Sequence, residues 1–337
     1  MHRNKTLLIL GIEGYSGQLI ARALSGPLTV VTPQISRGRT IADQLTDYAS
    51  VLEPGDLVLN CLGPFQYTYL DVLEFCLANA VHYFDICAEW QVFEAMQGLS
   101  ARAEEAGSML LPGIGFDVVA SDCLLGHVYK RCLDATRVQI GISGLELISR
   151  GSARTMADLI GEPLKVRRRG RIVAESRMLQ SSFDFGSGQR PALAVSWGDI
   201  STAWHSTGVP NIEVFFEATP ALSAAVFANK TFGWLATGGA LGQTAQNLLS
   251  RFPKGPQEAS RAKKNATVVV RANNDLGQVA ESRLHTREAY SFTADSSSAV
   301  LNYFSEHPAR AGFQTPNTVL GADFPMSLPH CMRVDQQ

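Results

Sequence analysis

The stretch Leu7–Leu19, LLILGIEGYSGQL, decides the fold of the N-terminal part of this chain. It opens with an apolar run, 7–10, that has no turn residue and is typical of a buried strand. Glycines follow at every third position, and a helical apolar pattern begins after them. A strand, a tight glycine turn and a helix in this order present helix N–H groups to the phosphates of a dinucleotide. The residues that we predict to form this site are Gly11, Gly14, Tyr15, Ser16 and Gly17.

The segment after the second predicted strand, 27–32, is where a dinucleotide site selects its cofactor. NAD enzymes hold the ribose 2′-hydroxyl with an acidic residue about 20 positions after the glycine turn, whereas a basic cluster there suits a 2′-phosphate. This chain has Ser36, Arg37 and Arg39 in that segment and no acidic residue before Asp43. The pattern favours NADP(H), with NAD(H) as the alternative. A solvated loop that happens to carry two arginines is the other interpretation.

Strands and helices alternate through the rest of the first 120 residues. Buried strands are predicted near 56–61, 82–87 and 109–112, and helices near 70–78 and 90–106. This alternation predicts a doubly wound parallel sheet, that is, a Rossmann-like α/β domain over residues 1–120. The short span between residues 33 and 55 has no room for a full strand and helix, so one half of the sheet is expected to be abbreviated.

The strand predicted at 56–61 ends in a sharp turn. Open α/β sheets bind ligands at the carboxyl ends of their strands. The residues added to the predicted cofactor site for this reason are Asn60, Gly63, Pro64 and Phe65.

Beyond residue 120 the pattern changes to half-buried strands and turns. Strand candidates lie at 136–144, 192–197, 211–217, 266–272 and 278–285, and 166–173 resembles a hairpin. Largely antiparallel strands with a few helices predict a second, α+β domain over 121–337, whose role would be substrate binding or dimerisation. The C-terminal segment of this second domain is an alternative contributor to the first domain, against which it would pack.

Composition excludes several classes of function. The 29 Lys and Arg nearly balance the 31 Asp and Glu, so no overall charge points to nucleic acid or to an anionic membrane. The six cysteines are scattered without a CxxC pair, which argues against structural zinc and a disulfide framework; no metal is expected.

The basic start MHRNK is followed by too short an apolar run for a signal peptide, and the polar residues within 231–250 argue against a membrane span. We therefore expect a cytoplasmic protein.

The densest polar stretch, 197–208, is expected to be a loop between two strands. His205 in this stretch is the first candidate for a general acid or a substrate-orienting donor, because its ordinary pKa lies near neutrality; a structural hydrogen bond inside a turn is the alternative. Asp199 either orients His205 or forms an Asx-turn. Tyr290 is the third catalytic candidate, with a place in the core as its alternative.

Substrate-binding candidates are Trp197, Ser206 and Thr207 in the same stretch, together with Arg150 and Arg154. An arginine pair suits a carboxylate or a phosphate, because the guanidinium offers a planar fork of donors.

Other groups receive a structural interpretation. Arg167–Arg169 are expected in a solvated turn, with the phosphate of coenzyme A or of a carrier protein as an alternative partner. Cys87 is expected to be a small buried side chain, and Asp117 and Asp122 to cap helices.

The linked motifs resemble the saccharopine dehydrogenase-like family, which includes trans-acting enoyl reductases. The motifs in the first domain are GIEGYSGQLIARAL, VLNCLGPF, HYFDICAE and LLPGIGFDVVASDCL. Those in the second are SRGSARTM, SWGDISTAWHSTGVPNIEVFF, HTREAYSFTA and GFQTPNTVLGADF. The resemblance spans most of the chain and implies an NAD(P)-binding Rossmann domain joined to an α+β domain, with the substrate between them. Glu13 and Ala88 depart from the small residue and the glycine that the family commonly has in GATGYTG and DxxGE.

The resemblance does not select one reaction. We predict an NADPH-dependent reductase of an activated double bond, with an enoyl thioester or a similar conjugated carbonyl favoured over an imine. The alternatives are a saccharopine-type amino acid dehydrogenase and a catalytically silent NADP(H)-binding protein. The partner is expected to be a small molecule, either free or linked to coenzyme A or a carrier. A homodimer is left open.

Overall fold

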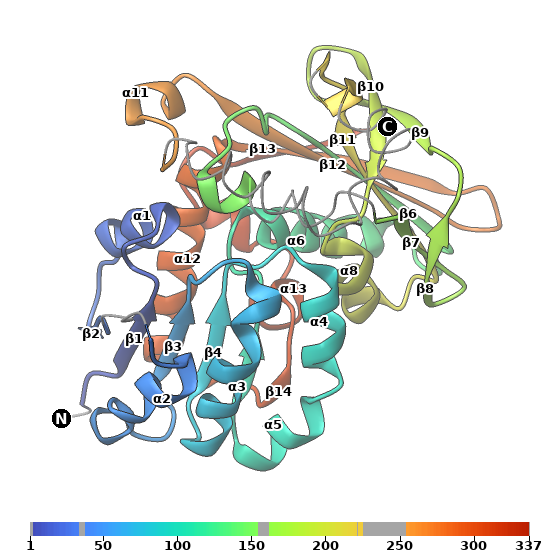
Figure 1. Ribbon diagram of the computed structural model, residues 1–337. Coiled ribbons are helices and arrows are strands. Elements are labelled where there is room, and N and C mark those ends of the chain that lie inside the picture. Colours follow the sequence, from blue (N-terminus) through green and yellow to red (C-terminus); the bar gives the residue numbers. More distant parts are fainter. Residues whose placement is uncertain (1–2, 34–37, 154–161, 221, 225–253, 337) are drawn as a thin grey trace.

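The protein is described by a computed structural model that covers residues 3–33, 38–153, 162–220, 222–224 and 254–336. The described chain forms two β-sheets, one in each half of the molecule, as Figure 1 shows. The stretch 231–250, which was expected not to span a membrane, lies outside the described residues. No helix among the described residues is both long and apolar enough to cross a bilayer.

The first sheet is parallel and has six described strands in the order β14-β5-β4-β3-β1-β2. Their bounds are β1 Thr6–Leu10, β2 Thr29–Val31, β3 Leu57–Asn60, β4 His82–Asp85, β5 Met109–Leu111 and β14 Gly312–Phe313. Strands β1, β3, β4 and β5 are buried along their whole length, as is typical of the central strands of a parallel sheet.

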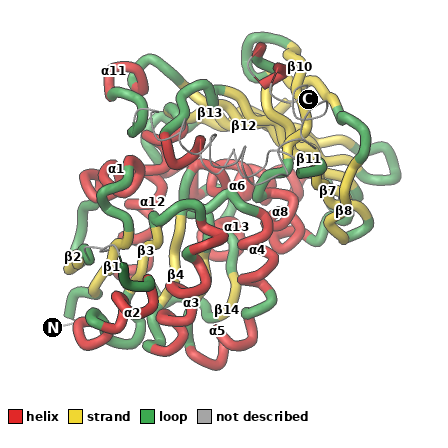
Figure 2. The backbone as a smooth tube through the Cα atoms, in the orientation of Figure 1, coloured by secondary structure: helices red, strands yellow, loops and turns green. Residues whose placement is uncertain are grey.

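Helices cover both faces of this sheet, as the tube in Figure 2 shows. Helices α1 (Tyr15–Ala23) and α12 (Ala289–Glu306) contribute apolar side chains to the core on one face. On the other face the core includes residues of α2 (Ile41–Thr46), α3 (Tyr69–Ala78), α4 (Trp90–Gln97) and α5 (Ser100–Ala106). The predicted doubly wound Rossmann-like domain is therefore confirmed. The helix expected over 90–106 is two helices, α4 and α5, separated at Gly98 and Leu99.

Strand β2 ends the described sheet next to β1. The span between β2 and β3 contains α2 and a single 3-10 turn, Ala49–Val51, and the described residues add no further strand on that side. The two halves of the sheet meet between β1 and β3, where the strand order reverses. Open α/β sheets bind their ligands at this position.

The C-terminal part of the chain returns to the first sheet. Strand β14 pairs with β5 in parallel, and α12 packs against α1. The short helix α13 (Pro316–Leu320) packs against α6 (Phe116–Arg131), and a 3-10 turn, Phe324–Ser327, follows it. Residues 289–320 thus complete the shell of the N-terminal fold.

The second sheet has nine described strands and is mostly antiparallel, except that β6 and β11 run in parallel. Its bounds are β6 Arg137–Ser143, β7 Leu164–Arg168, β8 Arg171–Glu175, β9 Gln180–Asp184, β10 Gln189–Val195, β11 Asn211–Glu217, β12 Asn265–Asn273, β13 Val279–Arg287 and β15 Met332–Gln336. Helices α6 and α8 (Asp199–Thr207) share a core with one face of it, and α11 (Glu258–Arg261) precedes β12. The predicted hairpin at 166–173 is present as β7 and β8.

Two local predictions in the second domain are wrong. The stretch 199–207 is the helix α8, because its apolar residues Ile200 and Ala203 recur at helical spacing and pack against α6. Arg167 is not solvated: it is 2% exposed, and its guanidinium donates to Glu94 Oε1 at 2.5 Å and to the backbone oxygen of Ile200 at 2.6 Å. A helix of the first domain supplies this carboxylate, so the local sequence gave no sign of it.

Candidate active site

The glycine turn after β1 is built from close backbone contacts. Gly11 has φ = +75°, and a Cβ placed on it would lie 2.9 Å from the backbone of Cys61 at the end of β3. A Cβ on Gly17 would lie 2.5 Å from the carbonyl oxygen of Gly11. Gly11 therefore permits the left-handed turn beside β3, and Gly17 lets the first turn of α1 approach it.

Helix α1 begins at this turn without a side-chain cap. Its N-cap residue is Gly14, which makes no side-chain hydrogen bond and lies at the surface. The first N–H groups of a helix have no partner inside the helix, and its N-terminal end carries partial positive charge. An anion such as a phosphate is the ligand that this arrangement suits.

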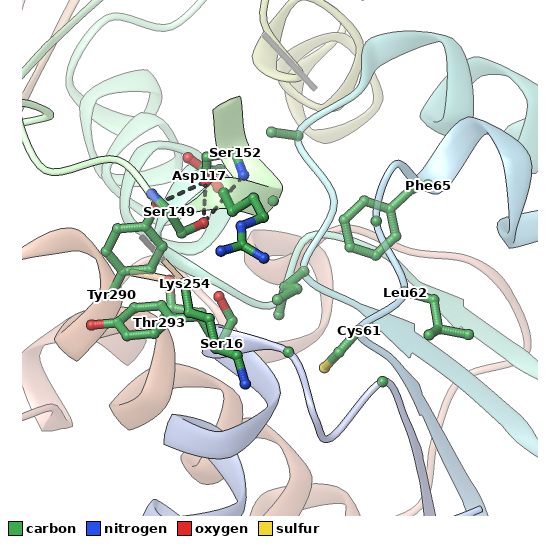
Figure 3. A pocket seen from close by; sticks show the side chains of 18 of the residues that line it. Ser16, Cys61, Leu62, Phe65, Asp117, Ser149, Ser152, Lys254, Tyr290 and Thr293 are labelled. Carbon is green, nitrogen blue, oxygen red and sulfur yellow. Dashed lines mark hydrogen bonds between the residues drawn. The ribbon is translucent and has the colours of Figure 1, made fainter. Parts of the chain in front are cut away.

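A cavity of about 400 Å³ opens at this end of α1. Gly11, Glu13, Gly14, Tyr15 and Ser16 line it, together with residues that follow β3 and β4: Cys61, Leu62, Gly63, Phe65, Ile86, Ala88 and Glu89. The start of α6, the second domain and α12 contribute the remaining wall: Asp117, Ser149, Arg150, Gly151, Ser152, Trp197, Lys254, Tyr290 and Thr293. Figure 3 shows the two walls facing each other, with Cys61, Leu62 and Phe65 opposite Asp117, Ser149 and Tyr290. We call this cavity the cofactor cleft.

The loop after β3 is held by a carboxylate from the loop after β4. Glu89 accepts hydrogen bonds from the backbone N–H groups of Phe65 at 2.9 Å and Gln66 at 2.8 Å. Asn60 is fully buried, and its Oδ1 accepts from the N–H of Leu62 at 2.9 Å. Asn60 thus shapes the lining of the cleft without being part of it.

A second, larger cavity of about 640 Å³ adjoins the cofactor cleft. Its wall is mainly apolar, with Phe116, Ile142, Leu145, Leu147, Ile148, Phe216, Pro220, Leu222 and Ala289. Its polar residues are Asp117, Ser143, Glu146, Ser152, Glu217, Thr219, Tyr290 and Thr293. We call it the apolar chamber. Ligand sites of this kind, mostly apolar with a few polar groups, are typical of organic substrates.

The cofactor cleft and the apolar chamber share five lining residues: Asp117, Ser152, Trp197, Tyr290 and Thr293. Among these, Asp117 has the side chain best suited to proton transfer. It lies in the first turn of α6, and the Oγ1 of Thr293 anchors that turn by accepting from the N–H of Phe116 at 3.0 Å. Burial raises the pKa of Asp117 to about 7. A carboxyl group with this pKa holds and releases a proton near neutral pH.

Tyr290 lies beside Asp117 in the shared wall. Its hydroxyl accepts a hydrogen bond from the N–H of Ser149 at 2.7 Å and lies 2.8 Å from Ser152 Oγ. Burial raises the pKa of Tyr290, so the phenol stays protonated. Tyr290 is therefore a neutral group that fixes the position of residues 149–152.

Half of the residues predicted for the cofactor, six of twelve, line the cleft. Those that line it are Gly11, Gly14, Tyr15, Ser16, Gly63 and Phe65. Gly17 lies one helical position away, and Pro64 and Asn60 belong to the supporting loop. Ser36 and Arg37 lie outside the described residues. Arg39 is exposed and donates to Asp47 at 2.7 Å and to the backbone oxygen of Asp43 at 2.6 Å.

Among the predicted catalytic and substrate residues, the structure brings together Tyr290, Trp197 and Arg150, all of which line the cleft. Trp197 also lines the apolar chamber, and its Nε1 is buried with no hydrogen-bond partner among the described residues. Arg154 lies outside the described residues.

His205 lies apart from the cofactor cleft. It lines a separate cavity of about 130 Å³ whose other residues are Gln97, Ser100, Arg310, Phe313, Gln314, Thr315 and Thr318. Its Nε2 is 3.7 Å from Glu94 Oε1, and its ring contacts Phe313 edge to face at 5.1 Å. His205 as a catalytic residue stays a prediction, and this separation argues against it.

Asp199, Ser206 and Thr207 are engaged inside the α6–α8 interface. Asp199 is fully buried and accepts from Ser121, not from His205, and burial raises its pKa to about 8. Ser206 donates to Asp122, and Thr207 donates to the backbone oxygen of Ala203 at 2.6 Å. None of the three lines the cofactor cleft or the apolar chamber.

Neither Asp117 nor Asp122 caps its own helix, α6, as was expected. Asp122 is inside α6 and fully buried, and its Oδ2 accepts from the N–H of Asn317 at 2.7 Å, so it caps the start of α13 instead of its own helix. Asp117 faces the two cavities. Its signal in the sequence was a carboxylate directly after a buried strand and a glycine turn, PGIGFD, which is the place where parallel sheets bind ligands. Lys254 was also missed, because no local pattern connects residue 254 with the glycine turn.

All six cysteines are free, and Cys87 is fully buried, which raises its pKa well above the ordinary value. The described residues contain no group of three or more His, Cys, Asp or Glu side chains arranged to hold a metal ion.

A glycine turn at the point where the strand order reverses, an uncapped helix N-terminus and an adjoining apolar chamber define a two-domain dinucleotide-dependent protein. Residues 7–111 match the family described as the saccharopine dehydrogenase NADP binding domain. The match covers less than a third of the chain, and over this part the chain resembles saccharopine dehydrogenase-like oxidoreductases, which supports an oxidoreductase that uses a nicotinamide cofactor. The match confirms that part of the predicted resemblance and supports NADP(H) as the preferred cofactor.

Curated relatives share the N-terminal part of the chain. The saccharopine dehydrogenase-like oxidoreductase of Mus musculus is 31% identical over 130 residues, which are 38% of this chain and 28% of the mouse protein. A probable mitochondrial saccharopine dehydrogenase-like oxidoreductase of Arabidopsis thaliana is 36% identical over 67 residues, 20% of this chain and 15% of that protein. Because these matches span less than a third of the relatives, they do not extend to a substrate.

The whole chain resembles a solved structure. Apo saccharopine dehydrogenase (L-Glu forming) from Saccharomyces cerevisiae aligns with a TM-score of 0.59 at 10% identity, covering 99% of this chain and 100% of that chain. At this identity the likeness confirms the two-domain fold alone.

The residues of the cleft fit a nicotinamide dinucleotide. The N-terminus of α1 is uncapped and faces the cleft, and Gly11 and Gly17 occupy positions where a Cβ would meet backbone atoms at 2.9 Å or less. Gly14, Tyr15 and Ser16 would hold the diphosphate, and the nicotinamide end would meet the substrate between the loop 61–65 and the second domain.

Proposed function

We propose that the chain is an NADPH-dependent reductase of an activated carbon–carbon double bond in a largely apolar substrate, such as an enoyl thioester. The observation that carries this proposal is the shared wall: the cofactor cleft and the apolar chamber meet at Asp117, Trp197 and Tyr290. A hydride donor in one cavity and an acceptor in the other would therefore face a group that exchanges protons near neutral pH.

The chemistry divides between cofactor and protein. Bound NADPH supplies two electrons as a hydride, which would form a C–H bond at the β-carbon and leave NADP⁺. Asp117 would donate a proton to the α-carbon, so that the double bond becomes a single bond, and would regain a proton from solvent. The apolar wall excludes water and holds the acyl chain, and Tyr290 keeps residues 149–152 in place.

The apolar chamber disfavours a saccharopine-type amino acid as the substrate. Such a substrate carries several carboxylates and needs cations in its site. Among the described residues that line the chamber there is no lysine or arginine, whereas Asp117, Glu146 and Glu217 are acidic. Arg150 lines the cofactor cleft and not the chamber.

The test compares substrates under identical conditions. Oxidation of NADPH is followed by absorbance with a medium-chain 2-enoyl thioester, with an imine formed from an amino acid and a keto acid, and with the keto acid alone. The proposal predicts turnover with the enoyl thioester and a product two mass units heavier. Turnover with only the imine would support the amino acid dehydrogenase. NADPH binding without turnover of any of the three would support the silent binding protein.

A location in the cytoplasm, a link of the substrate to coenzyme A or a carrier, and a homodimer are parts of the same proposal. Cell fractionation, comparison of free and thioester-linked substrates, and sedimentation of the purified protein test them one by one.

A further inference from the structure

The cofactor cleft poses a problem of charge. A dinucleotide brings two negative charges on its diphosphate, and NADPH adds a phosphate on the ribose. Three carboxylates, Glu13, Glu89 and Asp117, line the same cleft. Among the described residues that line it, the first domain contributes no lysine or arginine. The two cations of the lining are Arg150 and Lys254, and both come from the second domain.

Lys254 is one of these two cations. It lines the cleft together with Ser16 in the first turn of α1, and both are labelled in Figure 3; a Cβ on the next residue, Gly255, would lie 2.4 Å from the ring of Tyr15 in that turn. Lys254 is exposed, and its ammonium group makes no hydrogen bond or ion pair with the described residues. An ammonium group next to an uncapped helix N-terminus adds a full charge to the partial charge of the helix.

The segment 254–261 is fixed on the first domain by Tyr15. A Cβ placed on Gly255 would lie 2.4 Å from the ring of Tyr15, so only glycine allows the segment to pass this close. The hydroxyl of Tyr15 donates to the backbone oxygen of Pro256 at 2.6 Å and accepts from the guanidinium of Arg261. The guanidinium carbon also lies 5.7 Å from the centroid of the Tyr15 ring. These contacts hold Lys254 at the cleft.

The same tyrosine connects the segment to the shared wall. Its ring packs edge to face on Tyr290 at 5.1 Å, and the N–H of Arg150 donates to the backbone oxygen of Lys254 at 3.4 Å. The two cations of the cleft are thus joined through the backbone of the second domain.

From this geometry we infer that Lys254 binds the diphosphate of the dinucleotide, so that the second domain completes the cofactor site through the segment 254–261. The inference rests on the proposed function, because it takes the cleft to hold NADP(H). It adds that the glycine turn alone is an incomplete phosphate site, and that Lys254 offsets the negative charge of Glu13. Tyr15 and Gly255 are positioning residues for this lysine.

The diphosphate is common to NADPH and NADH, whereas the 2′-phosphate belongs to NADPH alone. Loss of Lys254 should therefore weaken both cofactors by the same factor. A residue that binds the 2′-phosphate would weaken NADPH only. Comparing the two cofactors therefore distinguishes binding of the diphosphate by Lys254 from binding of the 2′-phosphate.

The experiment is a fluorescence titration of the purified full chain with NADPH and with NADH, for the wild type, Lys254→Gln and Lys263→Gln. Lys263 is an exposed lysine near the end of the same segment that does not line the cleft, and it serves as the matched control. Lys254→Gln should raise both dissociation constants about tenfold, the size of one lost charge-assisted contact. It should also reduce their dependence on salt. Lys263→Gln should leave both within about twofold.

Gly255→Val provides a second test, because its side chain would displace the segment from Tyr15. It should weaken both cofactors like Lys254→Gln, with a melting temperature near that of the wild type. Unchanged affinities in Lys254→Gln, or a loss confined to NADPH, would overturn the inference while leaving the proposed function in place. A wild-type protein that binds neither cofactor would overturn both.

Discussion

The cofactor cleft and the apolar chamber share a wall but are built in different ways. The phosphate end of the cleft is made mostly of backbone: a glycine turn, a helix N-terminus and the loop after β3. The chamber is made of side chains from α6, β6, the segment 144–148, β11 and α12. A backbone site recognises a group common to many ligands, whereas a side-chain site sets the individual substrate. The cleft therefore includes part of the family match over residues 7–111, and we propose that the chamber selects the substrate.

The largest expected effect comes from the residue that both cavities share. Asp117→Asn should lower turnover about 100-fold or more, because an amide cannot donate the proton, while NADPH affinity stays within about twofold. In the wild type, turnover should fall as the pH rises through about 7, where Asp117 loses its proton. Steady-state rates from pH 5 to 9 and an NADPH titration test this. A variant with normal turnover would remove Asp117 from the mechanism.

A change in the backbone site should weaken cofactor binding. Gly11→Ala places a Cβ 2.9 Å from the backbone of Cys61 at a φ of +75°, so β1 and β3 must separate and NADPH affinity should fall about tenfold. Gly107→Ala is the control: φ is +70° there, but the Cβ would meet nothing within 4 Å. It should cost about 1 kcal/mol of stability from backbone strain and leave NADPH affinity unchanged. Equal affinity losses in both variants would contradict the close-packing role of Gly11.

Buried polar groups behind the shared wall should affect stability and not catalysis. The pKa of Asp199 rises from 3.8 to about 8 through burial, so the folded state keeps a proton that the unfolded chain releases. Its stabilising contribution is complete below pH 4 and is lost as the pH rises towards 8. Asp199→Asn should keep the bond from Ser121 and raise stability at pH 8 by at least about 1 kcal/mol. Melting temperatures between pH 5 and 9 measure this.

The opposite trend serves as a control. The N–H of Gly186 and Arg283 lower the pKa of Asp184, so its contribution is present near neutral pH and is lost on acidification. Asp184→Asn should therefore lose stability at pH 7. A higher melting temperature of Asp184→Asn at pH 7 would contradict this explanation. So would a difference in melting temperature between Asp199→Asn and the wild type that does not change with pH.

The smallest effect is expected at His205. His205→Gln should keep turnover within about twofold, because the residue lies in the small cavity beside Phe313 and not in the cofactor cleft. Steady-state turnover of His205→Gln is measured under the same conditions as that of Asp117→Asn and compared with it. A tenfold loss in His205→Gln with unchanged folding would mean that His205 acts in the reaction, as the sequence suggested.

The contrast between the cavities also explains what the sequence could predict. The glycine turn lies within a few residues of its strand and helix, so Gly11, Gly14 and the fold were predictable from local pattern. The chamber depends on contacts between distant segments, and its key residue, Asp117, looked like a helix cap.

Local polar density was misleading in α8. It drew attention to His205, whereas the helical spacing of Ile200 and Ala203 directs that helix towards α6. His205 and Ser201 then face Glu94 on α4 of the first domain. Neither that contact nor the place of Lys254 in the lining of the cleft could be predicted from the neighbouring sequence.

The central claim is that the cleft at the glycine turn binds a nicotinamide dinucleotide with a preference for NADPH. The measurement that tests it most directly is a fluorescence titration of the wild-type protein with NADPH and with NADH. We predict saturable binding of one NADPH per chain, tighter than that of NADH. Absence of NADPH binding at millimolar concentration would contradict the account.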